Sequence, residues 1–215
     1  MTAEPASRSK EQETEMVSSI QSIGSPLLRR IGRRAALAGL GGGLLSGLAG
    51  LALPARAGTL PLLPAALRRF VPPEPAPTVP FTTGAGQTRM LAAWRGDGIV
   101  LNLWATWCLP CKAEMPALDR LAQIVAASRI VVLPVSIDTG GRKAVMTFYR
   151  ENRIAHLPVL LDPEGRMVTA LKAPGVPTTV IIDRQGRMVG QVEGPVQWDA
   201  PSSVALLRKL VGAET

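Results

Sequence analysis

Two cysteines constrain this sequence more than any other feature. Cys108 and Cys111 are the only cysteines among the 215 residues, and they are three positions apart. A nearly continuous apolar run at residues 99–105 precedes them and predicts a buried strand. After them, apolar residues recur at helical spacing, which predicts a helix over residues 108–127. A C-x-x-C pair between a strand and a helix is typical of a thiol–disulfide exchange site.

Two other uses of the cysteine pair need to be weighed. A disulfide between positions so close closes almost no loop, so it would stabilise the fold very little. A zinc site would need two further ligands, and the sequence has a single histidine, His156. Copper(I) could be held by the two thiolates and stays an alternative. We expect redox exchange, with no cofactor besides the redox-active Cys108–Cys111 disulfide and a structural role for His156.

Composition and charge set wider limits. The chain is 47% hydrophobic, enough for one domain with a sizeable core plus additional segments. Its net charge is +8, from 24 Lys and Arg against 16 Asp and Glu. Aromatic residues are few and no basic run occurs in the expected domain, so no nucleic-acid partner is expected.

The N-terminal part has the pattern of an export segment. Residues 1–34 are polar and end in an arginine-rich stretch, and residues 35–53 are uncharged. A small-x-small triplet ending at Ala57 follows, which is typical of a cleavage site. We therefore predict an export signal or membrane anchor at residues 35–57. The domain would lie in the periplasm or otherwise outside the cytoplasmic membrane, either anchored by residues 35–53 or soluble after cleavage near Ala57.

The export route is less definite. The stretch from Gly32 to Leu37 resembles a twin-arginine export signal through Arg33 and Arg34. It departs from the usual pattern at Gly32, where Ser or Thr is preferred, and at Ala36, where Phe is preferred. The general secretory route remains the alternative.

Residues 58–80 contain seven prolines. Proline-rich chain is extended and semi-rigid, so this stretch is predicted to be a spacer that holds the domain off the membrane. A short helical turn at residues 65–70 could interrupt it. The folded domain is then expected to occupy residues 81–215.

Strand and helix patterns alternate through this domain. Strands or extended segments are predicted at 81–83, 89–93, 99–105, 130–137, 156–161, 178–183 and 188–193, and helices at 108–127, 142–152, 166–172 and 202–211. This order predicts an α/β protein with a thioredoxin-like fold, in which helices flank a central mixed sheet.

Four motifs now identify a family resemblance. They are the stretch Trp104–Cys111, then Glu114–Pro116, then Leu160–Pro163, and finally Gly175–Thr179. Together they resemble the membrane-associated thioredoxins of the TlpA/ResA/DsbE group, over residues 81–211. The resemblance implies an N-terminal β-extension and a family-type insertion before the strand that follows a cis-proline.

The residues themselves predict the roles of the cysteines. Cys108 lies at a helix N-terminus, where unpaired N–H groups and the helix dipole stabilise a thiolate. This thiolate would attack a substrate disulfide and form a mixed disulfide. Cys111 lies one helical turn further on and would attack Cys108 to release the reduced substrate.

The resemblance implies further site residues. Pro177 would be cis and lie against the cysteines, so that the backbone of Val176 pairs with an extended substrate. Trp107 is expected to form an apolar rim for the substrate. Glu114 corresponds to a glutamate that faces the redox site in related proteins, where it would exchange a proton with Cys111; the alternative is a solvated helix glutamate.

Asn102 is a departure from ordinary thioredoxins. They have a buried aspartate six residues before the first cysteine, and here that position is Asn102, which cannot titrate. The proton-transfer role is therefore expected to fall on Glu114.

The expected function is extracytoplasmic reduction of a cysteine pair in an exported protein. By resemblance, the substrates would be apocytochrome c or a copper-site protein, and a membrane thiol transporter of the DsbD/CcdA kind would supply electrons. A dithiol oxidant or isomerase and a Cu(I)-binding assembly module are the alternatives.

Overall fold

The computed structural model describes residues 59–212. The predicted polar region at residues 1–34 and the predicted signal or anchor at residues 35–57 lie outside this range. Within residues 59–212, no helix is both long enough and apolar enough to cross a membrane.

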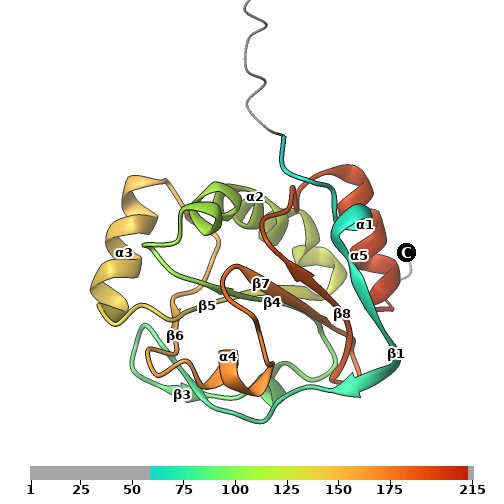
Figure 1. The fold of residues 1–215 in the computed structure, drawn as a ribbon, viewed down its shortest axis with the longest axis horizontal. Helices are drawn as coiled ribbons and strands as arrows, with labels where there is room; N and C mark the ends of the chain where they lie inside the picture. Colours follow the sequence, from blue (N-terminus) through green and yellow to red (C-terminus); the bar gives the residue numbers. More distant parts are fainter. Residues whose placement is uncertain (1–58, 213–215) are drawn as a thin grey trace, which may run out of the picture. The chain divides into compact units, whose positions relative to one another are not determined.

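The core of the protein is one eight-stranded mixed sheet (Figure 1). The strand order is β1-β8-β7-β4-β5-β6-β2-β3. The strands are β1 (Arg68–Pro75), β2 (Phe81–Thr83), β3 (Thr88–Arg89), β4 (Gly98–Trp104), β5 (Ile130–Ser136), β6 (Leu160–Leu161), β7 (Thr178–Ile182) and β8 (Arg187–Glu193). β4, β5 and β6 are parallel, and the remaining pairs are antiparallel.

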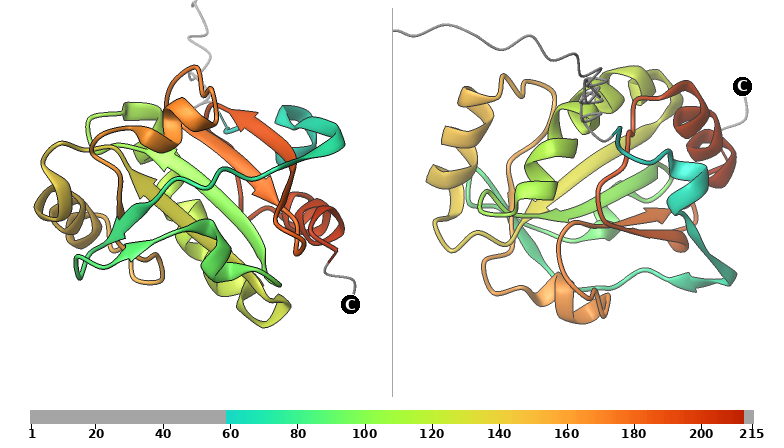
Figure 2. Two further views of the ribbon diagram at one scale, coloured as in Figure 1. Left: turned by 90° about the horizontal axis from the view of Figure 1, so that it is seen from below. Right: turned by 45° about the horizontal axis from the view of Figure 1, so that its top comes forward.

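Helices cover both faces of the sheet. They are α1 (Leu63–Ala66), α2 (Leu109–Val125), α3 (Gly141–Glu151), α4 (Arg166–Ala170) and α5 (Pro201–Leu210), with 3-10 turns η1 (Leu91–Trp94) and η2 (Ala126–Ser128). α1, α2, α3 and α5 lie on one side of the sheet and α4 on the other (Figure 1). The views in Figure 2 place α3 and α5 at opposite ends of the first layer, with α2 between them. This arrangement confirms the predicted thioredoxin-like α/β fold.

The central strand β4 explains why the core has two layers. All seven of its residues are buried, because helices or loops cover both faces. Side chains alternate along a strand, so Val100 and Trp104 join the cluster beneath α2, whereas Leu101 and Leu103 join the cluster beneath α4. Asn102 is on the same face as Val100, which directs its polar side chain towards α2.

Most predicted elements are found within two residues of their expected ends. Only Leu160–Leu161 of the extended segment predicted at residues 156–161 forms a strand. The strand predicted at residues 89–93 ends at Arg89. The chain then forms η1, because the Ala93 N–H bonds to the Met90 carbonyl at 3.0 Å and Leu91 turns into the core with 5% of its surface exposed. Leu91 packs beneath the sheet, whereas Ala92 and Ala93 are exposed, so this segment does not extend the sheet.

The predicted spacer at residues 58–80 is instead largely part of the folded domain. Its first half forms α1, whose Leu63 is completely buried. Its second half forms β1, which pairs antiparallel with β8. The prolines suit both places: Pro64 is in the first turn of a helix, and the prolines of β1 are on an edge strand, where fewer N–H groups are needed. Proline content alone therefore gave a wrong domain boundary.

A glycine in β8 fits the docked segment. A side chain at Gly190 would bring its Cβ within 2.6 Å of Leu67 and 3.4 Å of the Arg68 carbonyl oxygen. Because glycine has no Cβ, the chain between α1 and β1 can pass directly over the strand. Close packing at Gly190 indicates that this part of the domain is shaped to receive residues 63–68.

Leu63 provides a test of this docking. Leu63→Ala should lower the free energy of unfolding by about 2–5 kcal/mol, because it leaves a cavity in the core. The neighbouring Leu62 is 41% exposed, so Leu62→Ala should cost only about 0.5 kcal/mol. Urea unfolding of the full chain measures both, and equal midpoints for the two variants would contradict the docked position of α1.

Candidate active site

The cysteine pair lies where β4 passes into α2. β4 ends at Trp104, and Cys108 caps the N-terminus of α2 after a three-residue loop. The two sulfurs are 2.06 Å apart and form a disulfide. The N–H of Cys111 points at the Cys108 Sγ from 3.2 Å. Cys111 is fully buried and Cys108 is 5% exposed, so Cys108 is the sulfur nearer to solvent.

The segment around Pro177 lies against this disulfide. The peptide bond between Val176 and Pro177 is cis. The carbonyl oxygen of Val176 is 3.5 Å from the Cys108 Sγ. Trp107, next to Cys108, is 66% exposed. The structure thus brings Cys108, Val176 and Pro177 together as the resemblance implies, with an exposed indole adjoining them in sequence.

A buried aspartate fixes the loop that leads to the cysteines. Asp138 accepts hydrogen bonds from the Thr106 N–H at 2.8 Å and from the Thr106 hydroxyl at 2.7 Å. The Ser136 hydroxyl donates to the same carboxylate at 2.7 Å. The sequence analysis missed Asp138. The sequence does contain an indication of this role, because Asp138 follows β5 closely. β5 is the parallel neighbour of β4, so both strands end at the same edge of the sheet.

Glu114 is completely buried, so the alternative of a solvated helix glutamate is wrong. Its Oε1 accepts from the Asn102 Nδ2 at 2.9 Å. Its Oε2 accepts from the Trp198 Nε1 at 2.9 Å and from the Val196 N–H at 3.1 Å. Glu114 is three residues after Cys111 on α2, so the two buried side chains are neighbours on one helix face.

Burial raises the pKa of Glu114 from its ordinary value of 4.5 to about 7. Desolvation is the main cause, because it penalises the charged carboxylate. The hydrogen bonds from Trp198, Val196 and Asn102 act in the opposite direction and hold the shift back. A carboxyl with a pKa of about 7 can both take up and release a proton near neutral pH.

Asn102 joins this carboxyl to the rest of the site. Its Nδ2 donates to Glu114 and also to the Thr179 hydroxyl on β7 at 2.8 Å. Thr179 is two residues after Pro177, so one amide connects the acid to the strand behind the cis-proline. Sequence reasoning found Asn102 and Glu114 separately. It missed Trp198 and Thr179, which only the tertiary fold brings to them.

His156 has the structural role that its isolation in the sequence indicated. Its Nδ1 is 2.9 Å from the Asp119 carboxylate on α2, which also accepts the N–H groups of His156 and Ala155. Burial raises the pKa of Asp119, but these hydrogen bonds outweigh it and the net pKa is below the ordinary value. The cluster ties α2 to the loop before β6.

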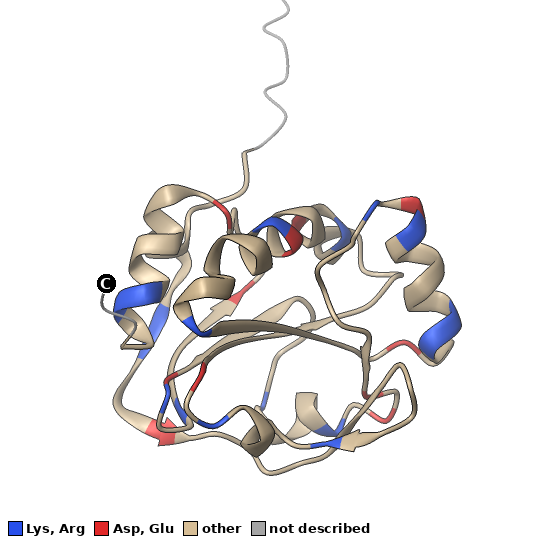
Figure 3. Ribbon diagram, turned by 180° about the vertical axis from the view of Figure 1, so that it is seen from behind, with Lys and Arg blue, Asp and Glu red and all other residues tan. Residues whose placement is uncertain are grey.

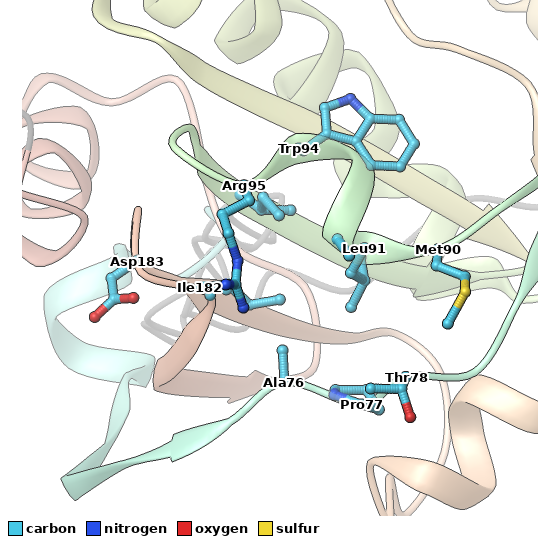
Figure 4. Close-up of a pocket in the computed structure, with 12 residues that line it drawn as sticks. Ala76, Pro77, Thr78, Met90, Leu91, Trp94, Arg95, Ile182 and Asp183 are labelled. Atoms are coloured by element: carbon cyan, nitrogen blue, oxygen red, sulfur yellow. The ribbon is translucent and has the colours of Figure 1, made fainter.

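One hollow of the surface adjoins the cysteines, and another lies away from them. An open groove of about 580 Å³ begins beside them, lined by Thr106 and Lys112 and by residues of α3. A smaller, partly open cavity of about 80 Å³ is lined by Leu91, Trp94, Ile99 and other residues (Figure 4). Ile99 is at the start of β4 and the cysteines follow its end, so this cavity is separate from the redox site.

Charged side chains are mostly kept away from the sheet. Figure 3 shows Lys, Arg, Asp and Glu mainly on helices and loops, while the central strands carry almost none. The described residues hold no group of three or more His, Cys, Asp and Glu side chains that could bind a metal ion. Five acids are nevertheless buried, namely Glu114, Asp119, Asp138, Asp162 and Asp183. Of these, Glu114 and Asp138 lie beside the cysteine segment.

The raised pKa of Glu114 predicts a pH-dependent stability. The folded state holds this proton up to about pH 7, whereas a solvated carboxyl releases it at about 4.5. The contribution is therefore complete below pH 4.5 and is lost as pH rises through 7, in total about 3 kcal/mol. Urea unfolding at several pH values should show this decline in the wild type, and Glu114→Gln should flatten it. Glu74→Gln removes an exposed acid on β1 and should keep the wild-type decline; parallel curves for Glu114→Gln and wild type would contradict the assignment.

The sequence of the chain is similar to those of known proteins. The model of the AhpC/TSA family matches residues 72–191, more than half of the chain. The thiol-disulfide oxidoreductase ResA of Geobacillus kaustophilus is 30% identical over 119 residues, which cover 55% of this chain and 67% of that protein.

Solved structures agree with these matches. A thioredoxin-family thiol:disulfide interchange protein from Chlorobium tepidum superposes with a TM-score of 0.53 at 25% identity, covering 63% of this chain and 96% of that one. An exposed lipoprotein thioredoxin from Streptococcus pneumoniae gives 0.51 at 27% identity, covering 61% and 96%. These similarities confirm the predicted resemblance. The chain belongs to the AhpC/TSA family, and it is a ResA-like oxidoreductase that acts on thiols and disulfides.

Proposed function

We propose that the protein reduces particular disulfides in exported proteins through Cys108 and Cys111. One observation carries this proposal: the Cys108 sulfur lies between a helix N–H and the Val176 carbonyl, beside a cis-proline. The helix end favours a thiolate at Cys108. The backbone of Val176 offers an extended chain a partner next to that sulfur.

The first step transfers the substrate to the protein. With both cysteines reduced, the Cys108 thiolate attacks one sulfur of the substrate disulfide. The bond between the two substrate sulfurs breaks, and the second sulfur leaves as a thiolate. Substrate and protein are then joined by a mixed disulfide at Cys108, with Val176 and the exposed Trp107 holding the substrate chain.

The second step releases the substrate. Cys111 gives its proton to the Glu114 carboxylate, and the resulting thiolate attacks the Cys108 sulfur. The Cys108–Cys111 disulfide forms, and the substrate leaves with both sulfurs reduced, so two electrons have passed to it. Glu114 suits the proton transfer because it is buried one helical turn from Cys111 and its pKa is about 7.

The substrates are exported proteins with a cysteine pair, either the haem-attachment cysteines of apocytochrome c or a copper-site pair. An oxidising compartment would leave Cys108 and Cys111 as a disulfide. A membrane thiol transporter of the DsbD/CcdA kind therefore returns two electrons after each cycle. The redox pair works without a further cofactor.

The domain works outside the cytoplasmic membrane. The basic flank, the apolar run at residues 35–53 and the triplet ending at Ala57 support this location. The exposed lipoprotein thioredoxin of Streptococcus pneumoniae, similar over 61% of this chain, supports it as well.

Replacing each cysteine is expected to have a different effect on the reaction. Cys108→Ser in the full chain should abolish reduction of insulin disulfides, because no nucleophile remains to form the mixed disulfide. Cys111→Ser should instead accumulate mixed disulfides with envelope proteins, because the resolving thiol is missing. Non-reducing gels and mass spectrometry identify the trapped substrates.

The double variant Cys108→Ser, Cys111→Ser is the control for trapping and should capture nothing. Full insulin reduction by Cys108→Ser would refute the mechanism. A strongly oxidising reduction potential of the Cys108–Cys111 pair, about −120 mV, would favour the oxidant alternative. Stoichiometric Cu(I) binding without reductase activity would favour the copper module.

Location can be tested through the arginine pair. Replacing Arg33 and Arg34 by lysine should block export if the twin-arginine route is used, whereas the general secretory route tolerates lysine. Protease added to spheroplasts should degrade the exported domain and leave a cytoplasmic marker intact; protection of both would contradict an extracytoplasmic location. N-terminal sequencing then separates cleavage, with a start at Gly58, from an anchor that retains residues 35–53.

A further inference from the structure

The loop of residues 194–200 links several parts of the redox site. It begins with Gly194, whose N–H donates to the Pro177 carbonyl at 2.9 Å. It continues with Val196 and Trp198, the two donors to the Glu114 Oε2. The loop thus reaches the cis-proline at one end and the buried acid in its middle.

The same loop is held from behind by the segment that precedes β1. Gln197 lies between the two Glu114 donors, and its N–H donates to the Pro61 carbonyl at 2.9 Å. Two residues later, the Leu63 N–H donates to the Ser203 hydroxyl at 3.1 Å, a bond that is itself buried. Leu63 and Trp198 are both fully buried in one core cluster.

We propose that residues 60–67 are a positioning element for Glu114, which they hold in place by pressing the 194–200 loop against it. The proposal rests on the role given above to Glu114. The stretch that follows the predicted export signal or anchor of residues 35–57 is then a working part of the redox site. Leu63 and Ser203 are positioning residues, because they bond to each other and neither is hydrogen-bonded to the cysteines or to Glu114.

The elements around Glu114 carry few charges. β4 and α1 carry none. On α2, Arg120 pairs with Asp199 of the loop at 2.6 Å and so holds its far end. Lys112 and Asp119 are the other charged residues of α2. The remaining charges on the packed elements are Arg187 and Glu193 on β8 and Arg208 and Lys209 on α5. The hydrogen-bond partners of Glu114 are all neutral, so its protonation depends on how tightly the loop excludes water.

The test is a titration of the Glu114 carboxyl by ¹³C NMR in the oxidised full chain. Leu63→Ala loosens the loop and admits water, so the pKa of Glu114 should fall from about 7 by about one unit. Ser203→Ala removes only the partner of the Leu63 N–H and should lower it in the same direction, even where Leu63→Ala folds poorly. Trp198→Phe keeps the loop packed but removes a donor to the carboxylate, so it should raise the pKa.

Leu91→Ala is the matched control. Leu91 is 5% exposed and belongs to the core cluster on the other face of the sheet. This variant loses the same side chain and comparable stability, yet it should leave the titration of Glu114 unchanged. An unchanged or raised pKa in both Leu63→Ala and Ser203→Ala would overturn the proposal, as would a fall of the same size in Leu91→Ala.

The outcome is separable from the proposed function. The oxidised protein titrates without any substrate or turnover, so the NMR measurement tests the positioning alone. Insulin reduction by the wild type tests the function alone. A lowered pKa of Glu114 in the variants, together with no reductase activity of the wild type, would support the positioning element and contradict the proposed function. Reductase activity of the wild type, together with an unchanged pKa of Glu114 in the variants, would support the function and contradict the positioning element.

Discussion

The arrangement of the site depends on keeping one carboxyl group out of water. Glu114 has no exposed surface, and its two oxygens are reached by donors from β4 and from the loop before α5. An unpaired charge there would be costly, so the strand, the loop and α2 must meet in one geometry. Gly194, the first residue of the same loop, donates its N–H to the Pro177 carbonyl, so the acid and the cis-proline are held by one network.

The elements that carry the cysteines could be predicted because their patterns are local. β4 is apolar on both faces except at Asn102, and α2 follows a cysteine N-cap and has a proline in its first turn. Cys108, Cys111 and Pro177 could be named as site residues from short motifs. Glu114 and Asn102 could be named from the sequence, but their hydrogen bond could not be.

The other partners of Glu114 could not be predicted, because they come from distant parts of the sequence. Trp198 is 84 residues from Glu114, and nothing in the neighbouring sequence shows that its indole is buried or which group it would bind. The proline-rich stretch was wrongly predicted to be a spacer for a different reason. Prolines exclude a segment from the interior of a sheet, but they leave its edge and the first turn of a helix open, and residues 63–75 use both.

The prolines of β1 have a consequence for the edge of the sheet. β1 and β3 are the two edge strands of the described sheet, and an edge strand ordinarily offers free N–H groups to any extended segment nearby. Pro72, Pro73 and Pro75 have no N–H to offer. An extended polypeptide therefore finds no backbone donor at three of the eight residues of this edge strand. The prolines of β1 thereby protect this edge of the sheet against pairing and aggregation with another chain.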